Sequence, residues 1–174
     1  GILNRETLPD HLIIVGGGVI GCEFACMYAS VGVPVTVLEA MPEICPNLDA
    51  DVAKTLREEL AKKGVNFKLD TKVESIDEKS VSFANAEGSD SLDGDLVLVA
   101  TGRAPNVKGL GLEELGLDFD PRGGVRVDDR GATNVPGLWA AGDVTGQAWL
   151  AHAASRMAEV VVHNLTGRTD RMRF

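Results

Sequence analysis

The chain has 174 residues, 44% of them hydrophobic and 25% charged, so it can bury the core of one solid domain or of two small ones. The net charge of −9 argues against a nucleic-acid partner, because binding there depends on phosphate neutralisation by lysine and arginine. Residues 1–11 do not have the features of a secretion signal and no apolar run approaches a membrane span, so we expect a cytoplasmic protein that has no membrane partner.

The first predicted element, after a linker at residues 1–10, is an apolar strand that runs into the sequence GGGVIG at residues 16–21. Gly16 stands where the chain must turn sharply from strand to helix. Gly18 lets the backbone approach a pyrophosphate, and Gly21 lets the new helix pack tightly on the strand. The N–H groups and positive dipole end of that helix would then face the phosphates. This spacing favours a dinucleotide-binding βαβ unit over the alternative, a glycine-rich turn without a ligand.

A second apolar strand at residues 33–38 ends in Glu39, whose carboxylate could accept hydrogen bonds from an adenosine ribose diol. NADP carries a phosphate on that ribose, and two unit charges about 4 Å apart repel by about 4 kcal/mol at an effective dielectric near 20. Half of that energy corresponds to more than a tenfold preference for NAD. No arginine in residues 40–44 reverses it, although a lysine or arginine from elsewhere in the fold could. The alternative is that Glu39 is a solvated strand end.

Three cysteines, Cys22, Cys26 and Cys45, do not form the framework of a disulfide-rich secreted protein. Cys22 and Cys26 lie four residues apart on the predicted helix, too far for an unstrained disulfide, and we interpret them as small buried hydrophobes. The alternative is a reactive Cys22 whose pKa is lowered by the helix N-terminus. No Cys/His cluster has the spacing of zinc ligands, so we expect no metal site.

The next predicted element is a helix that Asp49 begins and Gly64 ends, with an apolar face formed by Val52, Leu56 and Leu60. Alternation of apolar and polar residues then predicts short strands, and a run that is apolar on both faces predicts a central, buried strand. The ranges are a strand at 65–69, antiparallel strands at 73–76 and 80–84, a polar turn at 86–91 and the central strand at 96–100.

A glycine and a proline break the pattern at residues 101–106, where we place a domain boundary. Beyond it we expect strands at 124–128 and 137–141 and a final helix from about Leu150 to Leu165. The residues of this helix expected to face a core are Ala154, Met157, Ala158, Val161 and Leu165. The predicted fold class is α/β, a Rossmann-like parallel sheet with an antiparallel meander followed by part of a second α/β domain.

Four motifs occur in one order along nearly the whole chain: residues 16–25 with Glu23, DLVLVATGRAPN at 95–106, GLWAAGDVTG at 137–146 and LAHAA at 150–154. In this respect the sequence resembles the pyridine nucleotide-disulfide oxidoreductase family, and within it the dihydrolipoyl dehydrogenases. The resemblance implies an NAD-binding domain at residues 11–104 that is inserted into an FAD-binding domain, whose C-terminal half is residues 105–174.

The resemblance also implies roles for single residues. The three glycines of the turn would hold the NAD pyrophosphate, Glu39 the adenosine ribose, and Glu23 would lie near the nicotinamide. Asp143 would bind the ribityl chain of FAD, and Ala151 would face the flavin pyrimidine edge. The implied cofactor-binding set is Gly16, Gly18, Val19, Ile20, Gly21, Glu23, Glu39, Ala100, Gly102, Arg103, Gly142, Asp143, Leu150, Ala151 and His152. The alternatives are that Glu23 is an exposed helix carboxylate and that Asp143 caps the following loop.

In this family electrons pass from a dithiol through a redox disulfide to FAD and then as hydride to NAD. The sequence lacks three features of the family. These are the N-terminal FAD fingerprint, the closely spaced pair of redox cysteines, and the C-terminal dimerisation domain with its catalytic His and Glu. The resemblance therefore implies a fragment without a catalytic residue of its own, inactive alone. The full-length form would be a homodimer and a candidate component of a 2-oxo acid dehydrogenase complex.

Two alternatives remain open at this point. The chain could be an NAD(H)-binding module or sensor without redox activity. It could also be a fragment of another NADH-dependent disulfide or peroxide reductase.

Overall fold

The computed structural model describes residues 2–173 and divides the chain into two compact units, Gly1–Gly102 and Arg103–Phe174. In the part of the chain that the structure describes, the first unit has two hydrophobic cores and the second has one, and each unit is described by itself. Among the described residues, no helix has both the length and the apolar character needed to cross a membrane.

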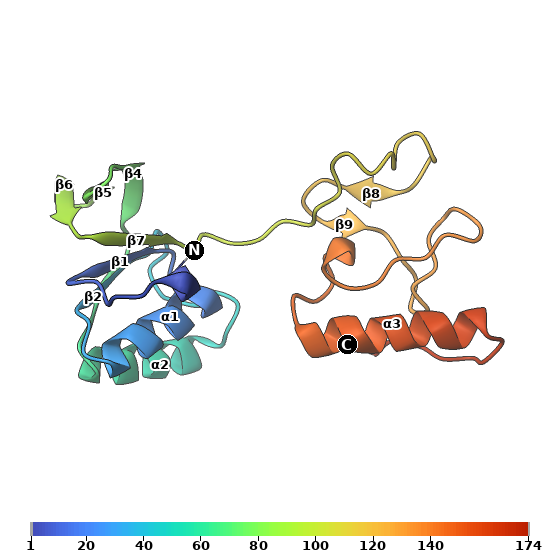
Figure 1. The fold of residues 1–174 in the computed structure, drawn as a ribbon, viewed down its shortest axis with the longest axis horizontal. Helices are drawn as coiled ribbons and strands as arrows, with labels where there is room; N and C mark the ends of the chain where they lie inside the picture. The colour runs from blue at the N-terminus through green and yellow to red at the C-terminus, as the bar shows by residue number, and fades with distance from the viewer. Residues whose placement is uncertain (1, 174) are drawn as a thin grey trace. The chain divides into compact units, whose positions relative to one another are not determined.

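The centre of the first unit is a four-stranded parallel sheet (Figure 1). Its strands pair in the order β3-β2-β1-β7, and Leu12 of β1 lies opposite Val35 of β2 and Leu96 of β7. The sequences of β1 and β2, which are rich in β-branched residues, suit strands that are covered on both faces, and all residues of these two strands are buried. The bounds are β1 Leu12–Val15, β2 Val35–Leu38, β3 Val65–Lys68 and β7 Leu96–Val99.

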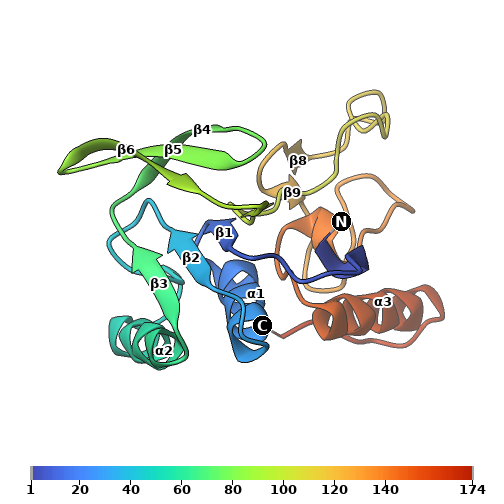
Figure 2. The same ribbon diagram turned by 60° about the vertical axis from the view of Figure 1, so that its left-hand side comes forward.

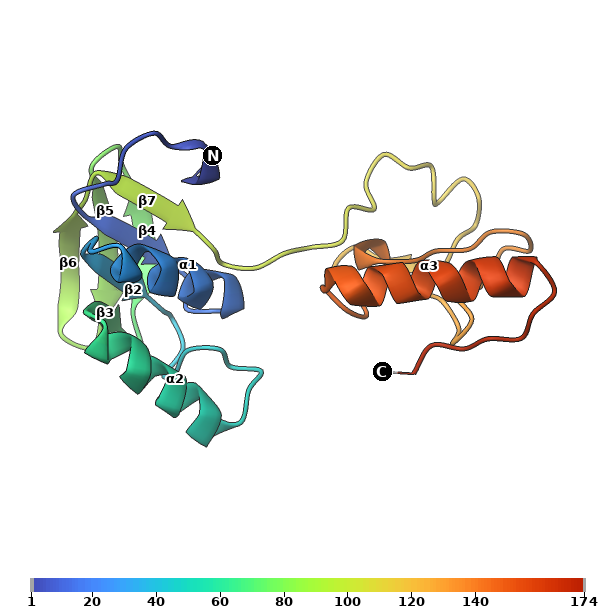
Figure 3. The ribbon, with the colours of Figure 1, turned by 60° about the horizontal axis from the view of Figure 1, so that its bottom comes forward.

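Alternate residues of β1 face two different layers. Leu12 and Ile14 point into a core formed with helices α1 (Val19–Ser30) and α2 (Ala50–Lys62), which lie side by side on one face of the sheet (Figure 3). Ile13 and Val15 point into a second core on the opposite face. The Rossmann-like sheet predicted from the sequence is confirmed. In the described unit, both helices lie on one face of this sheet.

The second core is closed by an antiparallel meander. Its strands are β4 (Lys72–Ile76), β5 (Ser80–Asn85) and β6 (Gly88–Asp93), in the order β4-β5-β6. Val81 and Phe83 of β5 are buried against β1 and β2. The first unit therefore has three layers: helices, parallel sheet and meander.

Two expectations for this unit are wrong. The polar segment 86–91 was expected to be a turn, but β6 begins at Gly88 and pairs with β5 along its whole length, while its polar side chains stay exposed. The strand at 96–100 was expected to be central, but β7 is the last strand of the sheet in the described chain, and Val99 is 58% exposed. Apolar sequence on both faces of β7 does not guarantee a neighbour on both edges.

The ends of the first unit's helices follow the sequence only in part. Asp49 occupies the N-cap position of α2, although its side chain makes no capping hydrogen bond. Leu60 is buried and Leu56 packs on the core, as expected, whereas Val52 is half exposed. Before β1, residues Ile2–Asn4 form a single 3-10 turn, η1, whose Ile2 carbonyl accepts a hydrogen bond from the Tyr28 hydroxyl.

The second unit is mostly irregular (Figure 2). Its regular elements are β8 (Phe119–Asp120), β9 (Gly124–Val125), the 3-10 turn η2 (Asp143–Thr145) and helix α3 (Ala151–Leu165). The strand expected at 124–128 shortens to β9, which pairs only with β8. The strand expected at 137–141 is reduced to one bridge between Trp139 and Ala132. Neither segment has a longer partner among the described residues, so no ladder extends along them.

Helix α3 has the expected bounds within one residue but a different buried face. Ala153, Met157 and Val160 are buried, whereas Ala158 and Leu165 are exposed. Both sets have helical spacing, so the sequence pattern alone could not select between them. Of the expected core residues in this helix, Met157 is confirmed as buried.

Candidate functional site

The turn between β1 and α1 is too tight to accommodate side chains at Gly16 and Gly21. Gly16 has φ +106, and a Cβ there would lie 2.5 Å from the carbonyl oxygen of Ala100. A Cβ on Gly21 would lie 2.0 Å from the carbonyl oxygen of Gly16. Gly18 is different, because a Cβ there would meet no atom within 4 Å. Gly16 and Gly21 thus allow the helix and the strand to pack closely, while the backbone at Gly18 stays open.

The carboxylate of Glu39 is held beside this turn. Its Oε2 accepts the Gly17 N–H at 2.5 Å and its Oε1 accepts the Met41 N–H at 2.8 Å. The residue is only 8% exposed, so the alternative of a solvated strand end is wrong. A carboxylate has about four acceptor sites, so two bonds to the backbone orient it and leave capacity for a ligand's hydroxyl groups.

A groove of about 510 Å³ joins these features at the carboxyl ends of β1, β2 and β7. This is the edge at which doubly wound sheets bind their ligands. Of the residues predicted to bind cofactor, five line it: Gly16, Gly18, Glu39, Ala100 and Gly102. Further lining residues that the sequence did not single out are Met41, Pro46, Asn47, Thr71, Lys72 and Val73. They belong to the loop after β2, the end of the β3–β4 connection and the start of β4, which only folding brings to the groove.

Other predicted residues of the first unit lie around the helix start. Val19 and Ile20 are exposed in the first turn of α1, and Gly21 is buried beneath it. The first N–H groups of a helix have no partner within the helix, so this end can receive an anion. Glu23 is exposed and lines a different groove, beside the cysteines.

Cys22 is not a reactive thiol of lowered pKa. Burial, then the neighbouring Cys45, Glu39 and Glu23, raise its pKa to about 12. The alternative of a reactive cysteine at the helix N-terminus is therefore wrong, and the interpretation as a small buried side chain holds for Cys22. Its partner in space, Cys45, lies 23 residues away in sequence, and no local pattern pointed to it.

The remaining predicted residues lie in the second unit. Arg103 Nη2 is 2.6 Å from Asp143 Oδ2, and the Arg103 guanidinium lies 5.4 Å from the ring centroid of Trp149. Asp143 begins η2 directly after Gly142, and its carboxylate bonds Arg103 rather than capping the loop that follows. The others, Leu150, Ala151 and His152, are exposed at the start of α3.

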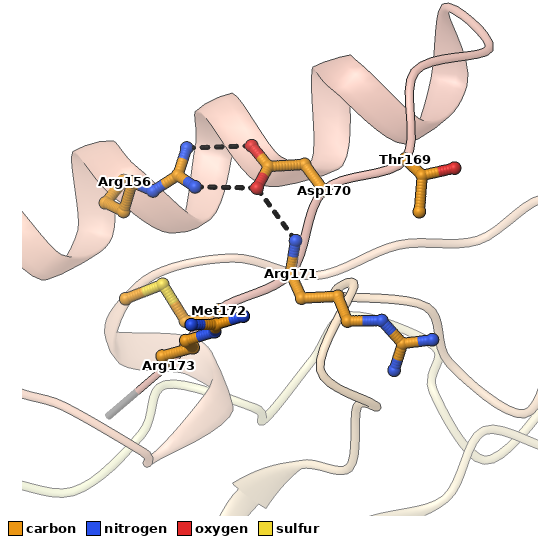
Figure 4. Close-up of a pocket in the computed structure, with 6 residues that line it drawn as sticks. All are labelled: Arg156, Thr169, Asp170, Arg171, Met172 and Arg173. Carbon is orange, nitrogen blue, oxygen red and sulfur yellow. Dashed lines mark hydrogen bonds and ion pairs between the residues drawn. The ribbon is translucent and has the colours of Figure 1, made fainter.

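Another pocket of the second unit, about 480 Å³, has a structural explanation (Figure 4). Its described lining is Arg156 and the segment 169–173, which includes none of the predicted cofactor residues. Asp170 bonds Arg156 at 2.7 and 2.9 Å and His163 Nδ1 at 2.7 Å. These contacts attach the chain after α3 to the helix. Hydrogen bonds from Arg156 and His163 hold the pKa of the Asp170 carboxyl well below its usual range.

Replacing Asp170 by asparagine is expected to loosen residues 168–173 and lower the thermal stability of the chain at pH 7. Because its folded-state pKa is depressed, the Asp170 carboxylate contributes stability above its unfolded pKa near 4, and this is lost as the pH falls through the folded-state pKa. The difference in melting temperature between wild type and Asp170→Asn should therefore persist from pH 7 to about pH 4 and shrink below it. A difference that does not change with pH would contradict this account.

Within residues 2–173, no group of three or more His, Cys, Asp or Glu side chains is placed to hold a metal ion. The groove at the glycine turn is lined by the backbone at Gly16 and Gly18, the oriented carboxylate of Glu39, apolar side chains and a few polar ones, Lys72 among them.

Comparison with known proteins decides the family. Residues 1–158 match the family model described as pyridine nucleotide-disulphide oxidoreductase. The chain belongs to this family. Dihydrolipoyl dehydrogenase 3 of Pseudomonas putida is 41% identical over 180 residues, covering all of this chain and 38% of that protein. Dihydrolipoyl dehydrogenase of Chlamydia muridarum is 36% identical over 174 residues, covering all of this chain and 37% of the relative.

Solved structures give the same result. The HOCl-induced flavoprotein disulfide reductase of Escherichia coli superimposes with a TM-score of 0.85 at 36% identity, covering 98% of this chain and 39% of that one. LpdA of Mycobacterium tuberculosis superimposes with a TM-score of 0.84 at 34% identity, covering 98% and 38%. The chain thus has the fold of flavoprotein disulfide oxidoreductases and spans somewhat over a third of the length of the relatives it matches.

Proposed function

We propose that the first unit binds NAD(H) and that the chain is the NAD-binding portion, with part of the FAD-binding portion, of a dihydrolipoyl dehydrogenase-like flavoenzyme. In that enzyme hydride would pass from reduced flavin to NAD⁺. The observation that carries the proposal is the groove in which the open backbone at Gly18 and the oriented carboxylate of Glu39 face the same space.

The residues of this groove fit a dinucleotide. The pyrophosphate would lie at Gly18, against the N–H groups that begin α1, where the helix dipole favours an anion. The adenosine ribose would bind Glu39, whose carboxylate needs no reorientation because Gly17 and Met41 already fix it. The nicotinamide would extend toward Ala100 and Gly102 at the end of β7.

For the second unit we propose the flavin contacts implied by the family. Asp143 would bind the ribityl chain, with Gly142 beside it, and the N-terminal end of the 15-residue helix α3 at Ala151 would stabilise negative charge near the flavin. FAD, when bound, would supply two-electron transfer between a dithiol and the nicotinamide. Asp143 is bonded to Arg103 in this structure, so a ribityl hydroxyl would share or replace that contact. The domain boundaries, the homodimer, the 2-oxo acid dehydrogenase complex and the cytoplasmic location remain predictions.

Separate calorimetric titrations of the chain with NADH, NADPH and FAD test the proposal. We expect NADH to bind and NADPH to bind at least about tenfold more weakly, because its extra phosphate would lie against Glu39. We expect no tight FAD binding and no dihydrolipoamide oxidation by this chain. A chain that binds neither nicotinamide nucleotide would disprove the proposal, and tight FAD binding would disprove the expectation that flavin needs further protein.

Two variants separate the charges that decide between NADH and NADPH. Glu39→Gln removes the negative charge and should reduce the ratio of the NADPH to the NADH dissociation constant toward one. Lys72 lines the same groove, and its positive charge could favour the extra phosphate of NADPH. Lys72→Gln is the matched control and should keep or increase the ratio. Wild-type preference for NADPH that disappears in Lys72→Gln would contradict the role given to Glu39.

A second candidate is an NADH-dependent disulfide reductase with another substrate. The superposition on the E. coli disulfide reductase favours it as strongly as the dihydrolipoyl dehydrogenase identities favour the first. Both candidates need the same nucleotide groove, so assays of the full-length protein with dihydrolipoamide and with disulfides would separate them. An NAD(H)-binding module without redox activity would be inactive in all of these assays.

A further inference from the structure

Two cysteines from different elements meet behind the glycine turn. Cys22 lies in the first turns of α1 and Cys45 in the loop after β2, and their Sγ atoms are 3.8 Å apart. Both side chains are buried, at 4% and 3% exposure. Neither thiol forms a disulfide in this structure.

The pair contacts the carbonyl group of Gly17, which lies between two residues that line the candidate nucleotide groove, Gly16 and Gly18. The Cys22 thiol donates to the Gly17 carbonyl oxygen at 3.4 Å, and Cys45 Sγ lies 3.6 Å from the same oxygen. The backbone N–H of Cys45 also donates to it, at 2.9 Å. On its other side Gly17 donates its own N–H to Glu39. A single residue thus connects the two thiols with the carboxylate of the groove.

A second groove, which shares no lining residue with the nucleotide groove, borders the thiols. This second groove, of about 240 Å³, is lined by all three cysteines of the chain, together with Val19, Glu23, Leu48, Leu56 and Leu60. Its wall is largely apolar, so it suits a small uncharged solute better than an ion. Of the three cysteines, Cys26 is the most exposed, since it is only partly buried.

We propose that Cys22 and Cys45 are a modification site: a small uncharged oxidant of the peroxide class converts them to a disulfide, and this weakens nucleotide binding at the neighbouring groove. The first part stands on the position of the thiols. The second part rests on the proposed binding of NAD(H).

The chemistry balances with one peroxide for each disulfide. The Cys45 thiolate attacks one oxygen of hydrogen peroxide, the O–O bond breaks, and Cys45 becomes a sulfenic acid while the leaving hydroxide takes up a proton. The sulfur of Cys22 then attacks the sulfur of Cys45, the S–O bond breaks and a second water leaves. Two thiols lose two electrons and two protons, and the peroxide is reduced to two waters.

Disulfide formation must move the turn. An S–S bond is about 2.05 Å long, so the two sulfur atoms must approach each other by about 1.8 Å from their present separation. The thiol proton that bonds the Gly17 carbonyl is lost at the same time. Cys45 already has an unfavourable backbone conformation for a residue other than glycine, with φ +46. Displacement at Gly17 and Cys45 is transmitted to Glu39, because Gly17 donates to its carboxylate.

The surroundings of the thiols set the conditions under which they react. Burial, then the neighbouring Cys45 and the carboxylates of Glu39 and Glu23, raise the pKa of Cys22. Burial also raises the pKa of Cys45; the hydrogen bond with Cys22 lowers it in part, and Glu39 and Glu43 raise it further. From α2 the groove receives only Leu56 and Leu60. Because the thiolate is the nucleophile, oxidation should be slow at pH 7 and accelerate as the pH rises. We therefore expect the dithiol to withstand brief exposure and to respond to sustained oxidation.

The experiment treats the chain with hydrogen peroxide at pH 9 and at pH 7, maps the non-reduced peptides by mass spectrometry and titrates NADH after removal of the oxidant. We expect a Cys22–Cys45 disulfide that forms faster at pH 9 and an NADH dissociation constant about tenfold higher, reversed by dithiothreitol. Hydrogen exchange at the Gly17 amide should increase on oxidation, which gives a readout that does not depend on NADH.

Matched variants complete the test. Cys26→Ser keeps the pair and should behave as wild type, whereas Cys22→Ser and, as a second variant, Cys45→Ala should retain NADH affinity after peroxide. A disulfide that includes Cys26, over-oxidation without a Cys22–Cys45 bond, or a disulfide that leaves both NADH affinity and Gly17 exchange unchanged would overturn the proposal. Failure of the reduced chain to bind NADH would instead disprove the proposed function, while peptide mapping and Gly17 exchange would still decide whether the disulfide forms and moves the turn.

Discussion

Gly18→Val is expected to lower the NADH affinity of the chain by at least about 100-fold while the fold is retained, because the added side chain would occupy the position of the pyrophosphate. The backbone at Gly18 is extended, with φ −71 and ψ −176, a conformation that valine adopts readily. A Cβ at this position meets no protein atom within 4 Å. Loss of a favourable helix N-cap residue should cost about 1 kcal/mol at most. The substitution therefore tests ligand contact separately from folding.

The measurements are calorimetric titration with NADH and thermal unfolding of the same preparation. Met27→Val is the matched control, because Met27 is 44% exposed on the same helix and lies away from the groove. It should bind NADH as wild type does. A folded Gly18→Val chain with wild-type NADH affinity would show that the pyrophosphate does not lie at this turn.

Gly21→Ala is expected to reduce the stability of the first unit by about 2 kcal/mol. Overpacking costs up to about 3 kcal/mol, and alanine offsets about 1 kcal/mol of that through its better helix propensity. We expect the upper end of the overpacking cost because a Cβ on Gly21 would lie 2.0 Å from the Gly16 carbonyl oxygen, and backbone cannot move aside as a side chain can. The melting temperature of the unit should fall by roughly 10 °C.

Differential scanning calorimetry of Gly21→Ala and of Met27→Ala separates the two contributions. Met27→Ala changes an exposed position of the same helix, so helix propensity is altered there without a backbone clash. Equal melting temperatures for Gly21→Ala and wild type would mean that the contact between α1 and the turn is not close in solution.

The sequence was sufficient where local spacing determines structure. The glycine turn, the strand before it and the helix after it follow from one short segment. Gly21 was expected to let the helix pack tightly on the strand, and the structure leaves no room for a side chain there. Glu39 was predicted from its place at the end of a strand, but its two backbone donors were not. Those donors come from the turn and from the loop after β2, and only the folded sheet brings them together.

Where structure depends on distant neighbours, the sequence was insufficient. Segment 86–91 has the composition of a turn, and β6 forms there because β5 offers it a complete ladder. Segment 137–141 has the composition of a strand and finds only a single bridge. The contact between Cys22 and Cys45 and the presence of Lys72 in the groove likewise depend on loops whose paths no periodicity encodes.

Strand β1 is shared by both hydrophobic cores of the first unit, with Ile14 on the helical side and Ile13 on the side of the meander. Neither layer can separate from the sheet without exposing a face of the same four-residue strand. The helical layer and the meander are therefore thermodynamically coupled, and the unit behaves as one cooperative structure. The glycine turn continues directly from β1, so the geometry of the nucleotide groove persists for as long as that cooperative structure does.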